Sequence, residues 1–460
     1  MGGLWDQLPD LIMEKVYGYL SMRERYYASM VCWSWYRAFY LPKAWEVFVF
    51  DETTLTRKRF NYYTGWQYIL DHLRTQLCLS TVGEYFRILV FSPMTNFYNL
   101  YEFMNMISFY AEQQHLMGEK CTVKDIGRRV HTLKYTFPCN MSPRQEADWG
   151  RLYGTGGKLL AAVKRLMSNL CSLRHLELVD LMLDNFEALH LLDQVCCDHC
   201  LTLQTLRLIN PSKSPCQLLH VGVFINLQVL MISPQNLGED LLYLLGESQL
   251  KELHIVQNRY TPQDVAPMNP KAWTACARRN TRLRVHLSLE SIRERCILWQ
   301  ERAPVASILY NSPQCKLQDE ILNKTIEWYR DKICAFGHLG LPRYHQQKSF
   351  NGRIDPLLLM MAKECPKLHT LIVRERISTA TVLLLAENAI SLKRLYIRRN
   401  AVILRCDWPR NPEWSQEHFN WLKSNSRSYA ATELQVSERL GYSWHMLSDK
   451  EFKALAPHLY

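Results

Sequence analysis

A compact group of metal-binding residue types stands at Cys196, Cys197, His199 and Cys200. Thiolates and imidazoles at this spacing could supply half of a structural zinc site, which needs four such ligands. A second ligand pair at suitable spacing is missing, because Cys216 alone does not supply it. The alternative interpretation is a helix end whose thiols are buried against the next segment. We favour this alternative and expect no metal.

A glycine-rich stretch, Gly154-Thr-Gly-Gly-Lys158, invites comparison with a phosphate-binding loop. That loop requires glycine at position 152 and serine or threonine at position 159, and leucine occupies both positions. A turn before a helix explains the glycines instead. The 15 histidines include no His-Glu-x-x-His pattern, and we find no serine or cysteine nucleophile motif. The sequence therefore predicts neither an enzyme nor a bound cofactor.

The composition is that of a globular protein: among 460 residues, 48% are hydrophobic, 22% are charged and 12% are aromatic. Such a chain can bury a large core without disulfides or metals. The net charge of +11 comes from basic residues that are dispersed mainly as pairs, the longest run being Arg57-Lys58-Arg59. Dispersed charge is typical of a solvated surface, so we expect no nucleic-acid partner.

Cysteine usage and hydropathy indicate the compartment. The 15 cysteines are odd in number and scattered, and the first residues lack the basic start and apolar core of a signal peptide. No apolar run approaches the roughly 18 residues that a membrane helix needs. We therefore expect a protein of the cytoplasm or nucleus, with reduced thiols and no membrane association.

Leucine recurs in the pattern L-x-x-L-x-L through most of the chain. Strong copies begin at positions 173, 203, 227, 250, 368 and 392, and weaker copies begin at 86, 130 and 305. The intervals, such as 30 residues from 173 to 203 and 24 residues from 368 to 392, fit leucine-rich repeats of about 20–29 residues. Helical patterns fill the intervals, at 158–170, 185–200, 237–245, 317–332 and 378–390.

Alternation of strand and helix predicts an α/β fold, a solenoid with a parallel inner sheet and outer helices. Side chains between the leucines would point away from the core, because strand side chains alternate. Solenoids use that inner face for recognition, so we predict substrate-binding residues there. The candidates are His175, Glu177, Arg207, Val229, Met231, Glu252, His254, Ile372, Arg394 and Tyr396.

The N-terminal residues carry three short helical patterns. Leu8-Pro9-Asp10 opens the first, because proline suits the first helical turn, and Ser21-Met-Arg-Glu24 is a capping box that opens the second. The third runs over 33–40. Apolar residues lie on more than one side of these helices, and three short helices cannot bury them alone. The segment therefore either packs on the rest of the chain or docks on another protein.

This segment resembles the F-box along its full length of about 38 residues. The matching positions are the run from Leu8 to Leu20, the capping box, Val31, Cys32, Trp35 and Trp45. Leu11 departs from the motif, where an acidic residue is common. The resemblance implies docking to the Skp adaptor of cullin–RING ubiquitin ligases. It implies that the adaptor-binding residues are Leu8, Pro9, Ile12, Met13, Val16, Leu20, Val31 and Trp35.

These patterns divide the chain into four expected parts. They are an F-box at 4–49, a linker at 50–85, a degenerate leucine-rich-repeat solenoid at 86–404 and a C-terminal capping tail at 405–460. Residues 139–157 and 337–352 are expected to be long loops. The order of parts resembles the F-box-only subfamily. The tail would cover the open end of the solenoid, and a gate over the substrate surface is the alternative.

The resemblance implies a non-catalytic substrate receptor. The F-box would join the Skp adaptor and the cullin–RING core, and the solenoid would hold a protein substrate for ubiquitination. Two other hypotheses stay open at this point: a scaffold that acts outside the ligase, and a basic repeat protein that binds RNA.

Overall fold

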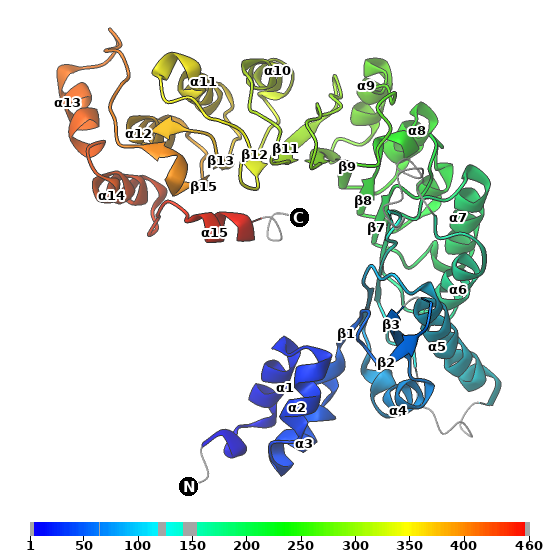
Figure 1. Cartoon of the computed structure of the whole chain (residues 1–460). Coiled ribbons are helices and arrows are strands. Elements are labelled where there is room, and N and C mark those ends of the chain that lie inside the picture. Colours follow the sequence, from blue (N-terminus) through cyan, green and yellow to red (C-terminus); the bar gives the residue numbers. More distant parts are fainter. Residues whose placement is uncertain (1–3, 64, 118–125, 141–153, 456–460) are drawn as a thin grey trace. The chain divides into compact units, whose positions relative to one another are not determined.

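The computed structural model describes residues 4–63, 65–117, 126–140 and 154–455 (Figure 1). The chain divides into two compact units, residues 1–249 and 250–460. In the described residues, the first unit holds three N-terminal α-helices followed by parallel strands with outer helices. The second unit holds further parallel strands, their helices and a helical tail. The predicted mixed α/β solenoid is therefore confirmed.

The N-terminal helices are α1 (Asp10–Tyr19), α2 (Met22–Ser29) and α3 (Trp33–Phe39). Pro9 stands at the N-cap of α1, one residue before the helix, and its carbonyl accepts from the backbone N–H groups of Ile12 (2.9 Å) and Met13 (3.1 Å). The predicted capping box of α2 is confirmed. The Ser21 hydroxyl accepts from the Glu24 backbone N–H, and the Glu24 carboxylate accepts from the Ser21 backbone N–H at 2.8 Å. Both orphan donors of the helix start are thereby satisfied.

The strands of the first unit form a parallel sheet in the order β1 (Val47–Phe50), β4 (Ile88–Phe91), β5 (Thr132–Thr136), β6 (His175–Val179), β7 (Thr205–Ile209) and β8 (Val229–Ile232). Their core leucines stand in register from strand to strand, as Leu176, Leu206 and Leu230 show. All three are fully buried beneath the helices. These helices are α5 (Phe97–Met117), α6 (Gly157–Ser168), α7 (Asn185–His199) and α8 (Glu239–Glu247).

The second unit repeats this arrangement with β9 (Glu252–Asn258), β10 (Arg284–Glu290), β11 (Val305–Asn311), β12 (Ala335–Leu339), β13 (Thr370–Val373) and β15 (Arg394–Ile397). The helices α9 (Pro270–Arg279), α10 (Asp319–Tyr329), α11 (Asp355–Glu364) and α12 (Thr379–Asn388) precede β10, β12, β13 and β15, respectively. Two short strands, β14 (Ile377–Ser378) and β16 (Val402–Ile403), pair beside them. The predicted helices at 158–170, 185–200, 237–245, 317–332 and 378–390 are confirmed to within a few residues.

The expected linker at 50–85 is folded. An antiparallel hairpin, β2 (Thr56–Asn61) and β3 (Gly65–Leu70), is followed by α4 (His72–Val82). The hairpin is tied to the repeats, because the Asn99 side chain accepts from the Leu70 backbone N–H at 2.9 Å and donates to the Tyr68 carbonyl. The parallel sheet also begins earlier than expected, at β1. Strand β2 consists mainly of polar, exposed residues, so a search for apolar repeats does not detect it.

The two expected loops also differ. The loop at 337–352 starts only after Leu339, because Gly337 lies inside β12. Of the loop at 139–157, residues 141–153 lie outside the described residues. Its end, Gly154 to Gly157, forms the turn that leads into α6, as the non-nucleotide interpretation expects. Among the helices in the described part of the chain, none combines the length and the apolar character that a membrane span requires.

The tail contains α13 (Gln416–Asn425), α14 (Tyr429–Leu440) and α15 (Asp449–Ala454). The first two pack against α12, where the Thr379 hydroxyl donates to the Ser426 carbonyl at 2.7 Å. The third lies across the strands on the side opposite to α10 and α11 (Figure 1). One tail therefore covers both the last helix of the repeats and part of the inner sheet face.

A candidate adaptor-binding face and the inner sheet faces

The interior of the three N-terminal helices is built around Tyr17, which is fully buried. Its hydroxyl donates to the Trp35 carbonyl at 2.7 Å, and burial raises its pKa to about 12. The guanidinium of Arg25 donates to the carbonyls of Tyr17 and Leu20, both at 3.0 Å, and lies over the ring of Trp45. These contacts join the C-terminal end of α1 to α2 and to the end of the helical segment.

The eight predicted adaptor-binding residues divide by exposure. Pro9, Ile12 and Val31 are exposed, and the last two side chains are 48% and 68% accessible. Leu8, Val16, Leu20 and Trp35 are half-buried. Met13 is fully buried, so it supports the surface from within and cannot contact a partner. The exposed members leave an apolar face that the chain itself does not cover.

Further apolar residues of these helices are exposed that the motif does not single out. They are Trp5, Leu11, Tyr19, Tyr26, Tyr27, Met30, Trp33, Tyr36 and Tyr40. Trp33 stacks on Tyr36 with ring centroids 5.4 Å apart. So many exposed apolar side chains on three short helices are typical of a protein interaction site. The signal in the sequence was the surplus of aromatic residues over what three short helices can bury.

The inner face of the first unit carries five of the predicted substrate-binding residues. His175, Glu177, Arg207, Val229 and Met231 are all half-buried and alternate with the core leucines. Burial, followed by the charge of neighbouring His131, lowers the pKa of His175. This face is therefore accessible to a partner.

One row of this inner face has a distinct charge pattern. Lys134, Glu177 and Arg207 stand in register on neighbouring strands, with Met231 next in the row. The Lys134 ammonium lies 2.7 Å from the Glu177 carboxylate. The buried Nε of Arg207 has no hydrogen-bond partner in the described residues. A row with one ion-paired lysine and one half-buried arginine is suited to an acidic or carbonyl-bearing group of a partner.

The inner face of the second unit is partly covered, and this corrects two predicted binding residues. Ile372 is 2% exposed and packs with Leu309, Leu339 and Phe452, the last from α15. Tyr396 is partly buried against the same cluster. The prediction assumed that alternation in a strand leaves one side open. The tail occupies that side because these positions are apolar.

The remaining predicted residues of the second unit lie elsewhere on its inner face. Arg394 is exposed at the start of β15. Glu252 and His254 are half-buried on β9, and β10 brings His286 beside His254. The two imidazole rings stack with centroids 4.3 Å apart and an interplanar angle of 17°. His286 is not among the predicted residues, although its alternation with Val285 and Leu287 in the sequence indicates this face.

The cysteines at the end of α7 are only partly as expected. Cys197 is exposed, whereas Cys196 and Cys200 are half-buried. The Cys196 thiol donates to the His220 carbonyl across 3.6 Å, and burial raises its pKa to about 11. The expectation that all three thiols are buried is therefore wrong for Cys197, because that side of the helix faces solvent.

Comparisons with known proteins give one family. No curated protein matches the chain. A similar solved structure is described as the crystal structure of the Rad7 and Elc1 complex in yeast, with 11% identity, 89% of this chain and 92% of that chain covered, and a TM-score of 0.38. Another is a TLR13–ssRNA13 complex, with 11% identity, 69% and 47% coverage, and a TM-score of 0.21.

The match to a family model falls on the N-terminal helices. Residues 5–46 match the model described as the F-box domain, and this range coincides with the helices whose apolar face is exposed. An F-box implies binding to a Skp-type adaptor. The chain therefore carries an F-box domain at its N-terminal helices.

Proposed function

We propose that this chain is the substrate-recognition subunit of a Skp–cullin–F-box ubiquitin ligase in the cytoplasm or nucleus. The observation that carries the proposal is the exposed apolar face of the F-box, to which Pro9, Ile12 and Val31 contribute. Apolar side chains left in water cost free energy that docking on an adaptor recovers. The adaptor would connect the chain to the cullin–RING core.

The first unit supplies the second surface that a receptor needs. Its inner face is accessible and carries the row with Lys134, Glu177, Arg207 and Met231. The inner face of the second unit is less suitable near Ile372, because α15 already covers it. We therefore place the protein substrate on the first unit. The receptor would do no chemistry and would act by raising the local concentration of substrate lysines.

Assembly of the ligase tests the proposal. The full chain is co-expressed with the Skp adaptor and the cullin, and the recovered cullin is measured for the unmodified chain and for Ile12→Glu. The matched control is Ile390→Glu, because Ile390 is 91% exposed and lies outside the F-box. We expect Ile12→Glu to abolish cullin recovery and the control to retain it. Equal recovery from all three proteins would contradict the proposal.

Substrate transfer is tested in the same reconstitution. A protein that binds the unmodified chain should be ubiquitinated by the assembled complex, and Arg207→Glu should prevent its capture without reducing cullin recovery. If a protein is bound and ubiquitin is never transferred to it, the chain acts as a scaffold outside the ligase. That result would overturn the receptor role while leaving adaptor binding intact.

A further inference from the structure

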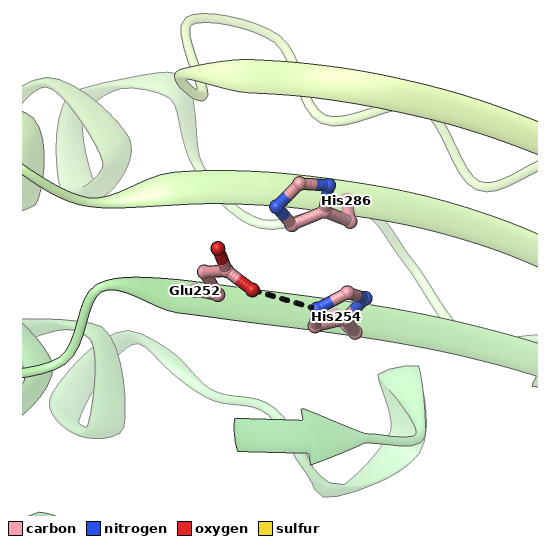
Figure 2. Close-up of side chains that lie close together, drawn as sticks. All are labelled: Glu252, His254 and His286. Carbon is pink, nitrogen blue, oxygen red and sulfur yellow. Dashed lines mark ion pairs between the residues drawn. The ribbon is translucent and has the colours of Figure 1, made fainter. Parts of the chain in front are cut away.

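Two histidines and a glutamate converge on the inner face of the second unit. Glu252 and His254 are two residues apart on β9, so their side chains point to the same side of the sheet. The register of β9 and β10 places His286 directly beside His254. One carboxylate oxygen and one ring nitrogen from each histidine lie within 4.8 Å of one another. Figure 2 shows a nitrogen of each ring on the side of the Glu252 carboxylate.

The separations in this cluster suit a shared ion better than a hydrogen bond. The Glu252 Oε2 atom lies 3.7 Å from His254 Nε2, which is too long for a hydrogen bond. Two ligands of one tetrahedral zinc ion, each at about 2.1 Å, are separated by about 3.4 Å. The ligand atoms here lie within 4.8 Å of one another. Closing the widest separation therefore requires movement of at most roughly 1.4 Å, within the reach of side-chain torsions. Binding would also tilt the two rings away from their near-parallel stack.

The neighbours of the cluster orient its donor atoms. His286 Nδ1 lies 2.7 Å from the Ser307 hydroxyl on β11. Its Nε2 is buried and has no hydrogen-bond partner in the described residues. Leaving such an atom unsatisfied costs about 1–3 kcal/mol. An imidazole whose other nitrogen is held by a hydrogen bond is the usual arrangement of a metal-binding histidine.

The carboxylate is oriented in the same way. The guanidinium of Arg284 donates to Glu252 Oε1 at 2.5 Å, so Oε2 is the oxygen that faces His254. This ion pair fixes the direction of the carboxylate and pairs the charge of Arg284. All five residues of the arrangement belong to three neighbouring strands, which hold them on a rigid surface.

We propose that Glu252, His254 and His286 form a binding site for a divalent transition-metal ion such as Zn²⁺. Two imidazoles and one carboxylate are borderline ligands that suit zinc, cobalt, nickel or copper, whereas calcium and magnesium require oxygen ligands. Three protein ligands leave a coordination position for a further group. The site is independent of the proposed ligase role, because none of its residues belongs to the F-box or to the first unit.

Zinc titration of the full chain tests this site. The protein is treated with a chelator under reducing conditions and dialysed against Zn²⁺ alone, and the bound metal is measured by elemental analysis. We expect Glu252→Gln and His286→Gln each to bind one equivalent less than the unmodified chain, or to bind it at least tenfold more weakly. Ser307→Ala, which removes only the orienting hydroxyl, should weaken binding by about 10–100-fold.

Two controls separate this site from adventitious binding. His445→Gln removes a histidine that also lies near a glutamate, 3.6 Å from Glu451, but has no second imidazole beside it, and it should change nothing. Cys197→Ser removes an exposed thiol and should also leave the equivalent bound. Zinc that survives both Glu252→Gln and His286→Gln, or that disappears with Cys197→Ser alone, overturns the proposal. Glu252→Gln preserves side-chain shape, so it decides the question even if His286→Gln unfolds.

Discussion

Phe452 of α15 packs against Ile372 of β13, and both side chains are buried in one hydrophobic cluster on the inner face of the second unit. The helix is held in place by a second capping box, in which the Ser448 hydroxyl and the Glu451 carboxylate each accept from the other residue's backbone N–H. Arg398 of the last repeat adds an ion pair to Asp449 at 2.7 Å. The tail is thus a covering element for the sheet.

Phe452→Ala should release α15 from the sheet. Removing a buried phenylalanine side chain typically lowers the free energy of unfolding by 3–5 kcal/mol, about the range expected here. We expect hydrogen exchange to increase in α15 and in β12 and β13, and the melting temperature of the second unit to fall. The control is Phe186→Ala, because Phe186 is 74% exposed and should change stability by less than about 0.5 kcal/mol. Unchanged exchange in α15 would show that the cluster does not hold the tail.

Gly337→Ala should disturb the same region from the strand side. A Cβ at this position would overlap the Cβ of Ile372 on the neighbouring strand, and overpacking of this kind costs about 1–3 kcal/mol. Gly18→Ala is the matched control. Apart from the neighbouring residues and the backbone of α1 itself, no atom of the described residues lies within 4 Å of a Cβ added there, and alanine should stabilise α1 by about 0.5–1 kcal/mol. Chemical denaturation should show a lower free energy of unfolding for Gly337→Ala and a higher one for Gly18→Ala, if this packing is correct.

Arg25→Lys should loosen the F-box. Arg25 is 7% exposed and its planar guanidinium reaches two carbonyls at the end of α1, which a lysine ammonium cannot reproduce with the same geometry. We expect a loss of about 1–3 kcal/mol, read from hydrogen exchange in α1 and α2. Arg37→Lys is the comparison, because the Arg37–Asp10 pair is exposed and 3.5 Å long and should contribute at most about 1 kcal/mol. Equal effects of the two substitutions would refute this role of Arg25.

His338 should make the second unit sensitive to acid. It is fully buried and stacks on Tyr310. Burial lowers its pKa to about 4; the charge of Glu375 raises this pKa and the charge of Arg374 lowers it, both by less. As the pH falls, His338 therefore binds a proton in the unfolded chain before it does so in the folded chain. The stability that the neutral ring provides is fully present above about pH 6.5 and decreases by about 1.4 kcal/mol per pH unit between there and about pH 4.

His338→Phe keeps a ring on Tyr310 and removes the titration. Melting temperatures of the second unit, measured at several pH values from 7 to 4, should fall less steeply for this variant than for the unmodified chain. His445→Phe, at an exposed histidine, should retain the original slope. Parallel slopes for all three proteins would mean that the pKa of His338 is the same in the folded and unfolded states.

The elements that could be predicted from the sequence are those with a strong local signal. The leucine pattern placed β6 to β9, β13 and β15, and the Ser21–Glu24 box placed the start of α2. Elements without that signal were missed. Strand β2 is mostly polar and exposed, and the end of β12 was predicted as loop because of Gly337, a residue that makes room for Ile372.

The candidate sites show the same division. Exposure of Pro9, Ile12 and Val31 agrees with the motif, because their positions depend on short helices. The covering of Ile372 could not be predicted, because it depends on a helix that returns from the end of the chain. The neighbourhood of His254 and His286 depends on strand register between distant segments. Alternation within a strand predicts the face of the sheet on which a side chain lies. It does not predict which residues of other segments pack against that side chain.

The affinity of the full chain for the Skp adaptor, measured together with melting on the same preparations, tests the adaptor face most directly. Ile12→Ala and Val31→Ala remove exposed side chains, so each should leave the melting temperature unchanged. At an interface hot spot each should lose at least ~2 kcal/mol, about thirtyfold in affinity. Ile390→Ala, at a 91% exposed isoleucine outside the F-box, should retain full affinity. Unchanged adaptor affinity with a lowered melting temperature in Ile12→Ala and Val31→Ala would contradict the account, because these residues would then serve only the packing of the chain.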